Sequence, residues 1–359
     1  MTDDPYLKLS LRERAELLDD VSRRRNLAPA ILEKDYWVCL TLGALFSLPE
    51  IGEHLVFKGG TSLSKVYGLI DRFSEDVDVS FHRDYLGFGD DRDPEAATSN
   101  KQQKQRIEEL QTACVTCIRE NLLPALSGKI TSILGSAEGW KIEVDPQDPQ
   151  TLLFQYPRAG TSALSYIKPS VKIELGARSD HWPKENHTFQ CYVGESLGLP
   201  IGIAAVQALA AERTFWEKAT LLHAECHRPS DKPMPARYAR HYHDLARLAK
   251  SSVAEKALAD TELRKRVVAH KSVYFRSASA HYELAVPPTL RLIPDPERLA
   301  ELEKDHDAMA PMFFTPPPPM EEILETLRDL ETKIQNLPHN TKTACAVSTT
   351  SLQPRLNAP

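Results

Sequence analysis

The feature that most constrains this sequence is residues 58–62, KGGTS, which are followed about one helix and one turn later by Asp76 and Asp78. Residues 55–57 are apolar and typical of a β-strand. The glycine pair can adopt backbone angles closed to other residues and lets a ligand approach the main chain. Thr61 or Ser62 can cap a helix, whose free N–H groups and positive dipole end favour a bound anion. We therefore predict a strand, a phosphate-binding turn, a helix and a second strand.

The two aspartates lie two residues apart on the second predicted strand, so Asp76 and Asp78 point to one face. Paired carboxylates beside a phosphate cradle suit hard divalent cations that carry a nucleoside triphosphate (NTP). Nucleotide-sugar glycosyltransferases also use a DxD pair, but they normally place it after a larger nucleotide-binding βαβ unit. The spacing is instead typical of nucleotidyltransferases related to DNA polymerase beta, in which two Mg²⁺ ions bridge the carboxylates and the triphosphate.

A third carboxylate could join this pair. Residues 170–176 alternate, with Val171, Ile173 and Leu175 on one face of a predicted strand and Lys172 and Glu174 on the other. If the apolar face points to the core, Glu174 emerges on the open face beside the aspartates. The alternative is a solvent-facing glutamate on an edge strand.

Ser74 lies two residues before Asp76. If its side chain faces the same site, a phosphate group on Ser74 would repel an NTP and compete for Mg²⁺. We therefore treat Ser74 as a candidate regulatory residue, and full activity in Ser74→Glu would contradict that role.

Composition narrows the class of protein. With 42% hydrophobic and 26% charged residues, the chain of 359 residues is an ordinary globular sequence that can hold two domains. Its apolar runs fall short of the about 20 residues that span a membrane, and its acidic, polar N-terminus is not that of a signal peptide. We expect a cytoplasmic protein whose six scattered cysteines, including the CxxC pair at 114–117, are reduced thiols.

Charge bears on the binding partners. A net charge of −6 argues against indiscriminate nucleic-acid binding, and we expect no DNA partner. Basic residues nevertheless recur between Arg237 and Arg276. Such a run is usually a solvated face, but on this chain it is also where a polyanion could bind.

Periodicity and turn residues predict an α+β protein in two main domains. The likeness to polymerase-beta-related nucleotidyltransferases implies that residues 1–195 form a core of that type, a small mixed sheet with flanking helices, and that residues 196–315 form a mainly helical domain that completes the site. A proline spacer and an acidic helix follow at 316–337, and the polar tail at 338–359 is predicted to be disordered. The Gly-, Asp- and Pro-rich residues 84–100 are predicted to be a mobile loop that could act as a lid.

The individual elements follow from the same patterns. Further strands are predicted at 140–144, 152–156, 171–175 and 189–193. Helices are predicted at 9–25, from Pro29 onward, and at 101–123, 203–226, 238–250, 252–274 and 320–337. On the helix from Pro29 we expect Glu33 and Asp35 to form a solvated edge.

Four stretches together resemble the AbiEii/AbiGii toxin family of nucleotidyltransferases, the toxin half of bacterial toxin–antitoxin and phage-defence systems. The resemblance spans about residues 27–248. The stretches are EKDY at 33–36, FKGGTSLSK at 57–65 with RFSEDVD at 72–78, EK at 217–218, and RHYHDL at 240–245. The last motif departs from the family pattern, because His241 replaces its first aspartate.

The resemblance implies a role for individual residues. Asp76 and Asp78 would hold Mg²⁺, with Glu174 as a third carboxylate, Lys218 would meet nucleotide phosphate, and Asp244 would complete the active site. The triphosphate would be bound by Lys58, Gly59, Gly60, Thr61, Ser62 and Lys65. Two plainer interpretations remain, in which Lys218 is a surface lysine paired with Glu217 and Asp244 forms a structural salt bridge to Arg240.

The function that the resemblance implies is Mg²⁺-dependent transfer of a nucleotide from an NTP to an acceptor, in several family members the 3′ end of tRNA, which blocks translation. A cognate antitoxin is then an expected partner. Two alternatives stay open. The same fold could nucleotidylate a protein hydroxyl, or it could be a non-catalytic nucleotide- or RNA-binding module, although the intact Asp76–Asp78 pair argues against the latter.

Overall fold

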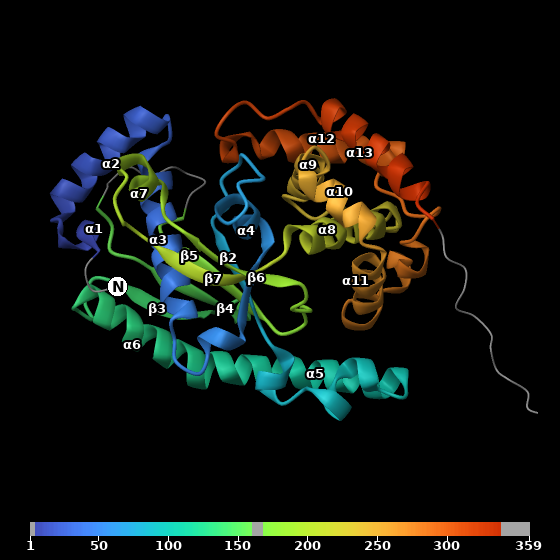
Figure 1. The fold of residues 1–359 in the computed structure, drawn as a ribbon, viewed down its shortest axis with the longest axis horizontal. Helices are drawn as coiled ribbons and strands as arrows, with labels where there is room; N and C mark the ends of the chain where they lie inside the picture. The colour runs from blue at the N-terminus through green and yellow to red at the C-terminus, as the bar shows by residue number, and fades with distance from the viewer. Residues whose placement is uncertain (1–3, 160–167, 339–359) are drawn as a thin grey trace, which may run out of the picture.

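The computed structural model describes residues 4–159 and 168–338, and the predicted tail lies, except for Pro338, outside them. The chain folds into a sheet with flanking helices, beside which lies a helical half (Figure 1). The sheet is mixed and seven-stranded, in the order β3-β4-β5-β2-β1-β7-β6. This is the predicted α+β class. No helix of the described residues is long and apolar enough to cross a membrane.

The centre of the sheet is built from strands that are distant in sequence. β2 pairs antiparallel with β1 and parallel with β5, and β1 pairs parallel with β7. The other pairs, β3 with β4, β4 with β5 and β6 with β7, are antiparallel. The strands are β1 (Leu55–Lys58), β2 (Asp76–Phe81), β3 (Lys141–Asp145), β4 (Asp148–Gln155), β5 (Val171–Gly176), β6 (Lys184–Phe189) and β7 (Ala204–Leu209).

Helices of the first half cover one face of this sheet. Their apolar residues form one core with the inward side chains of the strands, for example Val77 of β2 and Ile173 of β5. The opposite side chains of these two strands are left to face the helical half. The helices are α1 (Pro5–Lys8), α2 (Leu11–Arg25), α3 (Pro29–Phe46), α5 (Asn100–Cys117), α6 (Leu123–Leu134) and α7 (Tyr192–Leu197). A π-helical turn, Ile118–Leu122, joins α5 to α6.

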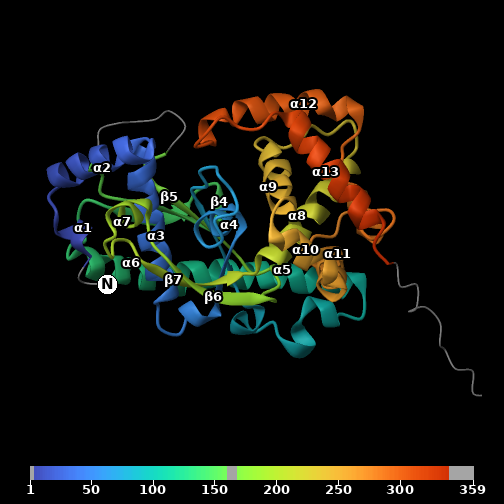
Figure 2. The ribbon, with the colours of Figure 1, turned by 45° about the horizontal axis from the view of Figure 1, so that its top comes forward.

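The helical half has a second core. Figure 2 shows α12 and α13 over α9 at its outer end, in agreement with their packing contacts. Its helices are α8 (Ala211–Cys226), α9 (Ala239–Ala249), α10 (Ser252–Ala259), α11 (Thr261–Tyr274), α12 (Pro296–Ala308) and α13 (Met320–Gln335). The short α4 (Gly59–Lys65) lies at the junction, where Leu63 joins the second core.

Several predicted elements differ from the structure. Residues 203–226 are not one helix, because Ala204, Val206 and Ala208 alternate into the core as strand β7, so the sheet extends to Leu209. The strand predicted at 189–193 is wrong, because β6 ends at Phe189 and the helix α7 begins at Tyr192. The helix expected at 252–274 is broken at Asp260, whose side chain caps α11.

The segment predicted as a mobile loop is folded into short 3₁₀ helices, Arg83–Leu86, Asp90–Arg92 and Pro94–Ala96. Asp93 is held there from three sides: Arg83 pairs with its carboxylate at 3.2 Å, Tyr274 donates a hydrogen bond to it at 2.7 Å, and Arg106 donates to its carbonyl at 2.8 Å. None of residues 84–100 lines the pocket described below. The segment therefore does not cover the pocket as a lid.

Candidate active site

The turn between β1 and α4 is shaped by its contact with β2. Lys58 lies opposite Asp78 in the antiparallel pair, and Gly59 has φ +81°. A Cβ atom on Gly59 would lie 2.0 Å from Asp78 Oδ2, and one on Gly60 would lie 2.8 Å from Arg72 Nη2 and 2.9 Å from the Ser74 hydroxyl. Position 59 therefore requires glycine, because its φ is positive and Asp78 packs directly on it, whereas a Cβ atom at position 60 would displace the ends of the Arg72 and Ser74 side chains.

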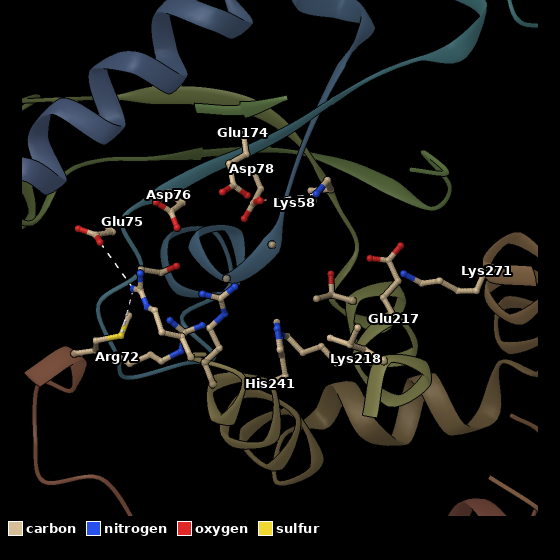
Figure 3. Close-up of a pocket in the computed structure, with 18 residues that line it drawn as sticks. Lys58, Arg72, Glu75, Asp76, Asp78, Glu174, Glu217, Lys218, His241 and Lys271 are labelled. Carbon is tan, nitrogen blue, oxygen red and sulfur yellow. Dashed lines mark hydrogen bonds and ion pairs between the residues drawn. The ribbon is translucent and has the colours of Figure 1, made fainter. Parts of the chain in front are cut away.

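Three carboxylates share one face of the sheet. Asp76 and Asp78 project from β2, and Glu174 lies beside Asp78 in the parallel register of β5. β5 has a neighbour on each side, so Glu174 is not on an edge strand. Figure 3 shows all three side chains turned toward the same pocket.

The pKa values of these carboxylates reflect burial first and the neighbouring charges second. Burial raises the pKa of Asp78 to about 6, with further increases from Glu174 and Asp76, and Lys58, whose Nζ lies 3.9 Å from Asp78 Oδ1, opposes them. Burial and the charges of Glu174 and Glu75 also raise the pKa of Asp76. Burial acts against Glu174 too, but its hydrogen bond and ion pair with Lys172 leave its pKa lowered.

This donor set fits Mg²⁺ that arrives with a substrate. Within residues 4–159 and 168–338, no group of three or more His, Cys, Asp or Glu side chains is arranged to hold a metal ion by itself. Mg²⁺ rarely needs such a cage, since it is usually bound through one or two carboxylates together with substrate phosphates. Asp76 and Asp78 would supply those carboxylates, and a bound cation would favour their ionised forms against the burial and the neighbouring negative charges that raise their pKa values.

The opposite wall is organised around Asp244, which is fully buried and lies behind the pocket lining. Arg72 binds it through two parallel hydrogen bonds of 2.8 Å, and Lys218 Nζ donates a third at 2.8 Å. Burial opposes ionisation of Asp244, but Arg72 and Lys218 hold its pKa well below the usual range. The partners are thus not those of the plainer interpretations, since Asp244 is bound to Arg72 rather than Arg240, and Lys218 to Asp244 rather than Glu217.

His241 lines the pocket at the position where the motif departs from its usual aspartate. Its Nδ1 lies 3.4 Å from Lys218 Nζ. Burial, followed by the charges of Lys218 and Arg240, lowers its pKa well below the ordinary value. The position therefore carries a neutral imidazole at physiological pH, with no negative charge to offset the neighbouring cations.

Thr61 and Ser62 are buried and do not line the pocket. The Thr61 hydroxyl donates a hydrogen bond to the Asp76 carbonyl at 2.5 Å and lies 2.9 Å from the Ser74 hydroxyl. Ser62 donates to the carbonyl of Gly59 at 2.9 Å. Both side chains therefore hold the glycine turn and the start of β2 in place, whereas Ser74 itself lines the pocket.

Lys65 points away from the pocket. Its Nζ pairs with Asp35 at 2.8 Å and lies 3.6 Å from the centre of the Tyr192 ring. Asp35 also accepts a hydrogen bond from the backbone N–H of Tyr192 at 2.6 Å. The solvated edge expected on α3 was therefore a wrong prediction, because Glu33 and Asp35 are both buried.

The pocket as a whole is a cavity of ≈ 250 Å³ between the sheet and the helical half. Its acidic lining residues are Glu75, Asp76, Asp78, Glu174 and Glu217. Its basic lining residues are Lys58, Arg72, Lys218, Arg237, Arg240 and Lys271. The sheet side is thus mainly acidic, and the side facing it carries most of the cations (Figure 3).

Some of these lining residues had no assigned role in the sequence. Arg237, Arg240 and Lys271 belong to the basic run, but a run of charges does not say which members face inward. Glu217 is held by Arg213, whose Nε lies 3.0 Å from its carboxylate. Arg72 belongs to the motif RFSEDVD and is buried. A buried arginine needs an anion beside it, and this need is the signal that could have linked Arg72 to Asp244.

A sheet that offers paired carboxylates, closed by a second half that offers cations, is suited to enzymes that move phosphate-bearing groups. The family model described as "Nucleotidyl transferase AbiEii toxin, Type IV TA system" matches residues 41–336. The match covers well over half of the chain, which therefore belongs to the AbiEii family of nucleotidyltransferase toxins.

Other comparisons add little to this. Among solved structures, the chain is similar to MenT4, a nucleotidyltransferase toxin from Mycobacterium tuberculosis H37Rv, with a TM-score of 0.48 and 17% sequence identity over 89% of this chain and 90% of that chain. No curated protein matches the chain.

Proposed function

We propose that this protein transfers a nucleotide from an NTP to the 3′ end of tRNA in an Mg²⁺-dependent reaction, and thereby blocks translation in the cytoplasm. The observation that carries this proposal is the division of one pocket into a carboxylate side and a cationic side. Because the protein belongs to a type IV toxin–antitoxin family, an antitoxin is an expected partner.

In this proposal the acidic residues of the pocket bind Mg²⁺ and the basic residues bind the phosphates. Mg²⁺ bound to Asp76 and Asp78 would neutralise triphosphate charge and lower the pKa of the attacking hydroxyl. Lys58 and Lys218 are placed to bind phosphate oxygens from opposite sides of the pocket. Arg72 is fixed by its two hydrogen bonds to Asp244, so it meets negative charge without reorganising.

An oxygen of the acceptor hydroxyl forms a bond to the α-phosphorus, and the bond from that phosphorus to the bridging oxygen of the β-phosphate breaks. Pyrophosphate leaves toward the cations of the helical half. The proton of the hydroxyl passes to a carboxylate oxygen of Glu174, which its ion pair with Lys172 keeps ionised.

The test is to incubate the protein with Mg²⁺, each labelled NTP in turn, and either total tRNA or cell lysate. Asp76→Ala should lose the labelling, and Asp329→Ala, an exposed aspartate on α13, should keep it. Label in RNA supports the proposal, whereas label only in protein would replace it with nucleotidylation of a protein hydroxyl. No label, together with equally harmless expression of wild type and Asp76→Ala, would rule out both.

A further inference from the structure

A second cavity, of ≈ 650 Å³, lies between α5 and the end of α11, outside the catalytic pocket. Three basic residues line it, Lys104 from α5, Arg178 from the segment after β5, and Arg276 from the segment after α11. Glu108 is the one acidic residue among those that line it in the described structure. The cavity is therefore a cationic surface on a chain whose net charge is −6.

A row of side chains connects this cavity to the catalytic pocket. Lys271 lines the catalytic pocket, and Phe275, four residues later, lines the second cavity. The Lys271 Nζ lies 4.3 Å from the centre of the Phe275 ring, and the guanidinium carbon of Arg178 lies 4.7 Å from it. The ring thus contacts two cations, one from each cavity lining, and the two cavities share one continuous basic and aromatic border.

Cationic and aromatic side chains along one surface are typical of a binding site for single-stranded nucleic acid. Proteins that bind single-stranded nucleic acid combine a cationic groove for phosphates with aromatic and guanidinium planes on which bases stack. Arg276 is also oriented, since it donates a hydrogen bond to the Asn100 side chain at 2.5 Å. A folded protein partner would need a broad surface, whereas two cavities that are linked only through the contact of Lys271 with Phe275 suit the end of a chain.

We propose that this border is the path of the acceptor strand. The terminal nucleoside enters the catalytic pocket past Lys271, and the preceding nucleotides of a single-stranded RNA 3′ end lie in the second cavity against Phe275, Arg178 and Arg276. This inference rests on the proposed function, and it adds the part of the molecule that recognises the acceptor.

The test measures RNA binding apart from nucleotide transfer. A fluorescently labelled single-stranded oligoribonucleotide is titrated against the full chain, and the Kd is followed by anisotropy at several salt concentrations. The exposed pair Lys104→Ala/Arg276→Ala should raise the Kd at least about tenfold and lower the slope of log Kd against log salt by roughly 0.7 for each phosphate that is no longer bound. Phe275→Leu should raise the Kd by roughly tenfold because it removes a stacking surface, with the slope unchanged.

The controls separate a direct contact from a folding defect. The pair Arg328→Ala/Lys333→Ala removes the same charges from the exposed side of α13 and should leave both the Kd and the slope unchanged. Affinity for the Mg²⁺–NTP complex should be unchanged in Lys104→Ala/Arg276→Ala and in Arg328→Ala/Lys333→Ala, because none of these four residues lines the catalytic pocket.

The outcomes also distinguish this inference from the function it rests on. One outcome is that wild type labels RNA, while Lys104→Ala/Arg276→Ala and Phe275→Leu bind the oligoribonucleotide as wild type does. The acceptor path is then overturned and the proposed function stands. If wild type binds the oligoribonucleotide through these residues but labels only protein, the second cavity binds an RNA that is not the acceptor, and both the acceptor path and tRNA as the acceptor are overturned. A wild type that neither binds nor labels RNA overturns both.

Discussion

At the scale of single residues, the site depends on a buried carboxylate that does not itself line the pocket. Asp244 is fully buried and bound by Arg72 and Lys218, which both line the pocket. Removing one member of such a cluster leaves the others as buried, unpaired charges, which costs more than the cluster contributes when it is intact. The buried carboxylate thus acts through the two cations that it positions.

Asp244→Asn should therefore lose both stability and activity. The neutral amide cannot balance Arg72 and Lys218, so we expect the free energy of unfolding to fall by about 3–5 kcal/mol in urea titrations. Asp329→Asn, on the exposed face of α13, is the matched control and should change it by less than about 0.5 kcal/mol. A change in Asp244→Asn as small as the control would show that the cluster is not needed for folding.

A pair of lysines separates structure from substrate binding. Lys65→Met leaves the carboxylate of Asp35 buried and unpaired, so the melting temperature should fall while NTP affinity in the folded protein is kept. Lys58→Met, in the pocket, should weaken NTP binding by roughly tenfold, the effect of about 1.4 kcal/mol, with little change in melting temperature. Calorimetric NTP titration and thermal unfolding measure the two effects, and weakened NTP binding in Lys65→Met would contradict this division.

At the scale of elements, the turn from β1 to α4 and the strand β2 form one unit. The turn is closed on one side by the side chains of Asp78, Arg72 and Ser74, and Asp78 leaves no room for a Cβ atom at Gly59. The Thr61 hydroxyl ties the first turn of α4 to the start of β2. Any displacement of the turn therefore displaces the carboxylates.

Two glycines with positive φ allow this coupling to be tested. Gly59→Ala should lower the rate of nucleotide transfer at least about 100-fold, because the new methyl group overlaps the Asp78 carboxylate and moves it. Gly68→Ala, at φ +62° with open space around it, carries only the backbone strain of about 1–2 kcal/mol and should keep its activity. Initial rates and unfolding midpoints are compared, and equal loss of activity in both variants would mean that strain alone is responsible.

The elements also show what the sequence could and could not predict. The strand–turn–helix–strand unit was evident because glycines, a β-prone run and alternating aspartates leave few other structures open. β7 was missed because its alternation of Ala204, Val206 and Ala208 involves small residues and runs directly into the helix α8. Lys65 lies within the recognisable motif, but its side chain pairs with Asp35 of α3. Which side of α4 faces the pocket depends on how α3 packs, and the motif alone does not give that packing.

At the scale of the whole molecule, residues far apart in the chain meet at the pocket. Arg72 and Asp244 are 172 residues apart, and Glu174 and Lys271 come from different halves. This explains why the motifs could be recognised one by one while their contacts could not be assigned. The helical half is also stabilised by buried hydrogen bonds of its own, among them those of His223.

His223 makes the stability of the helical half sensitive to acid. It is buried, accepts a hydrogen bond from the Arg291 N–H at 3.0 Å through Nδ1, and donates one to the His281 carbonyl at 3.0 Å through Nε2. These bonds hold the neutral ring, and burial, assisted by His227 and Arg291, lowers its pKa from 6.5 to about 4. Because the unfolded state binds the proton more readily, stability is fully present above pH 6.5 and is lost as the pH falls toward 4.

The expected loss from this one group is about 3 kcal/mol between pH 6.5 and pH 4. Urea unfolding at a series of pH values measures it. His223→Asn keeps an acceptor for the Arg291 N–H but removes the buried ring that titrates, so it should be less stable than wild type at pH 7 and show a shallower loss toward pH 4. The same pH profile in both proteins would exclude His223 as a source of the acid sensitivity.

The tie between Arg72 and Asp244 has a consequence for synthesis of the protein on the ribosome. A growing chain contains the glycine turn and the aspartates before it contains Asp244, the α9 residue that positions Arg72 and Lys218, because Asp244 follows Arg72 by 172 residues. Domains generally fold in order as they leave the ribosome. Fragments that terminate before Asp244 would thus carry the carboxylates but no complete pocket. A host in which translation is interrupted would therefore make fragments without toxin activity.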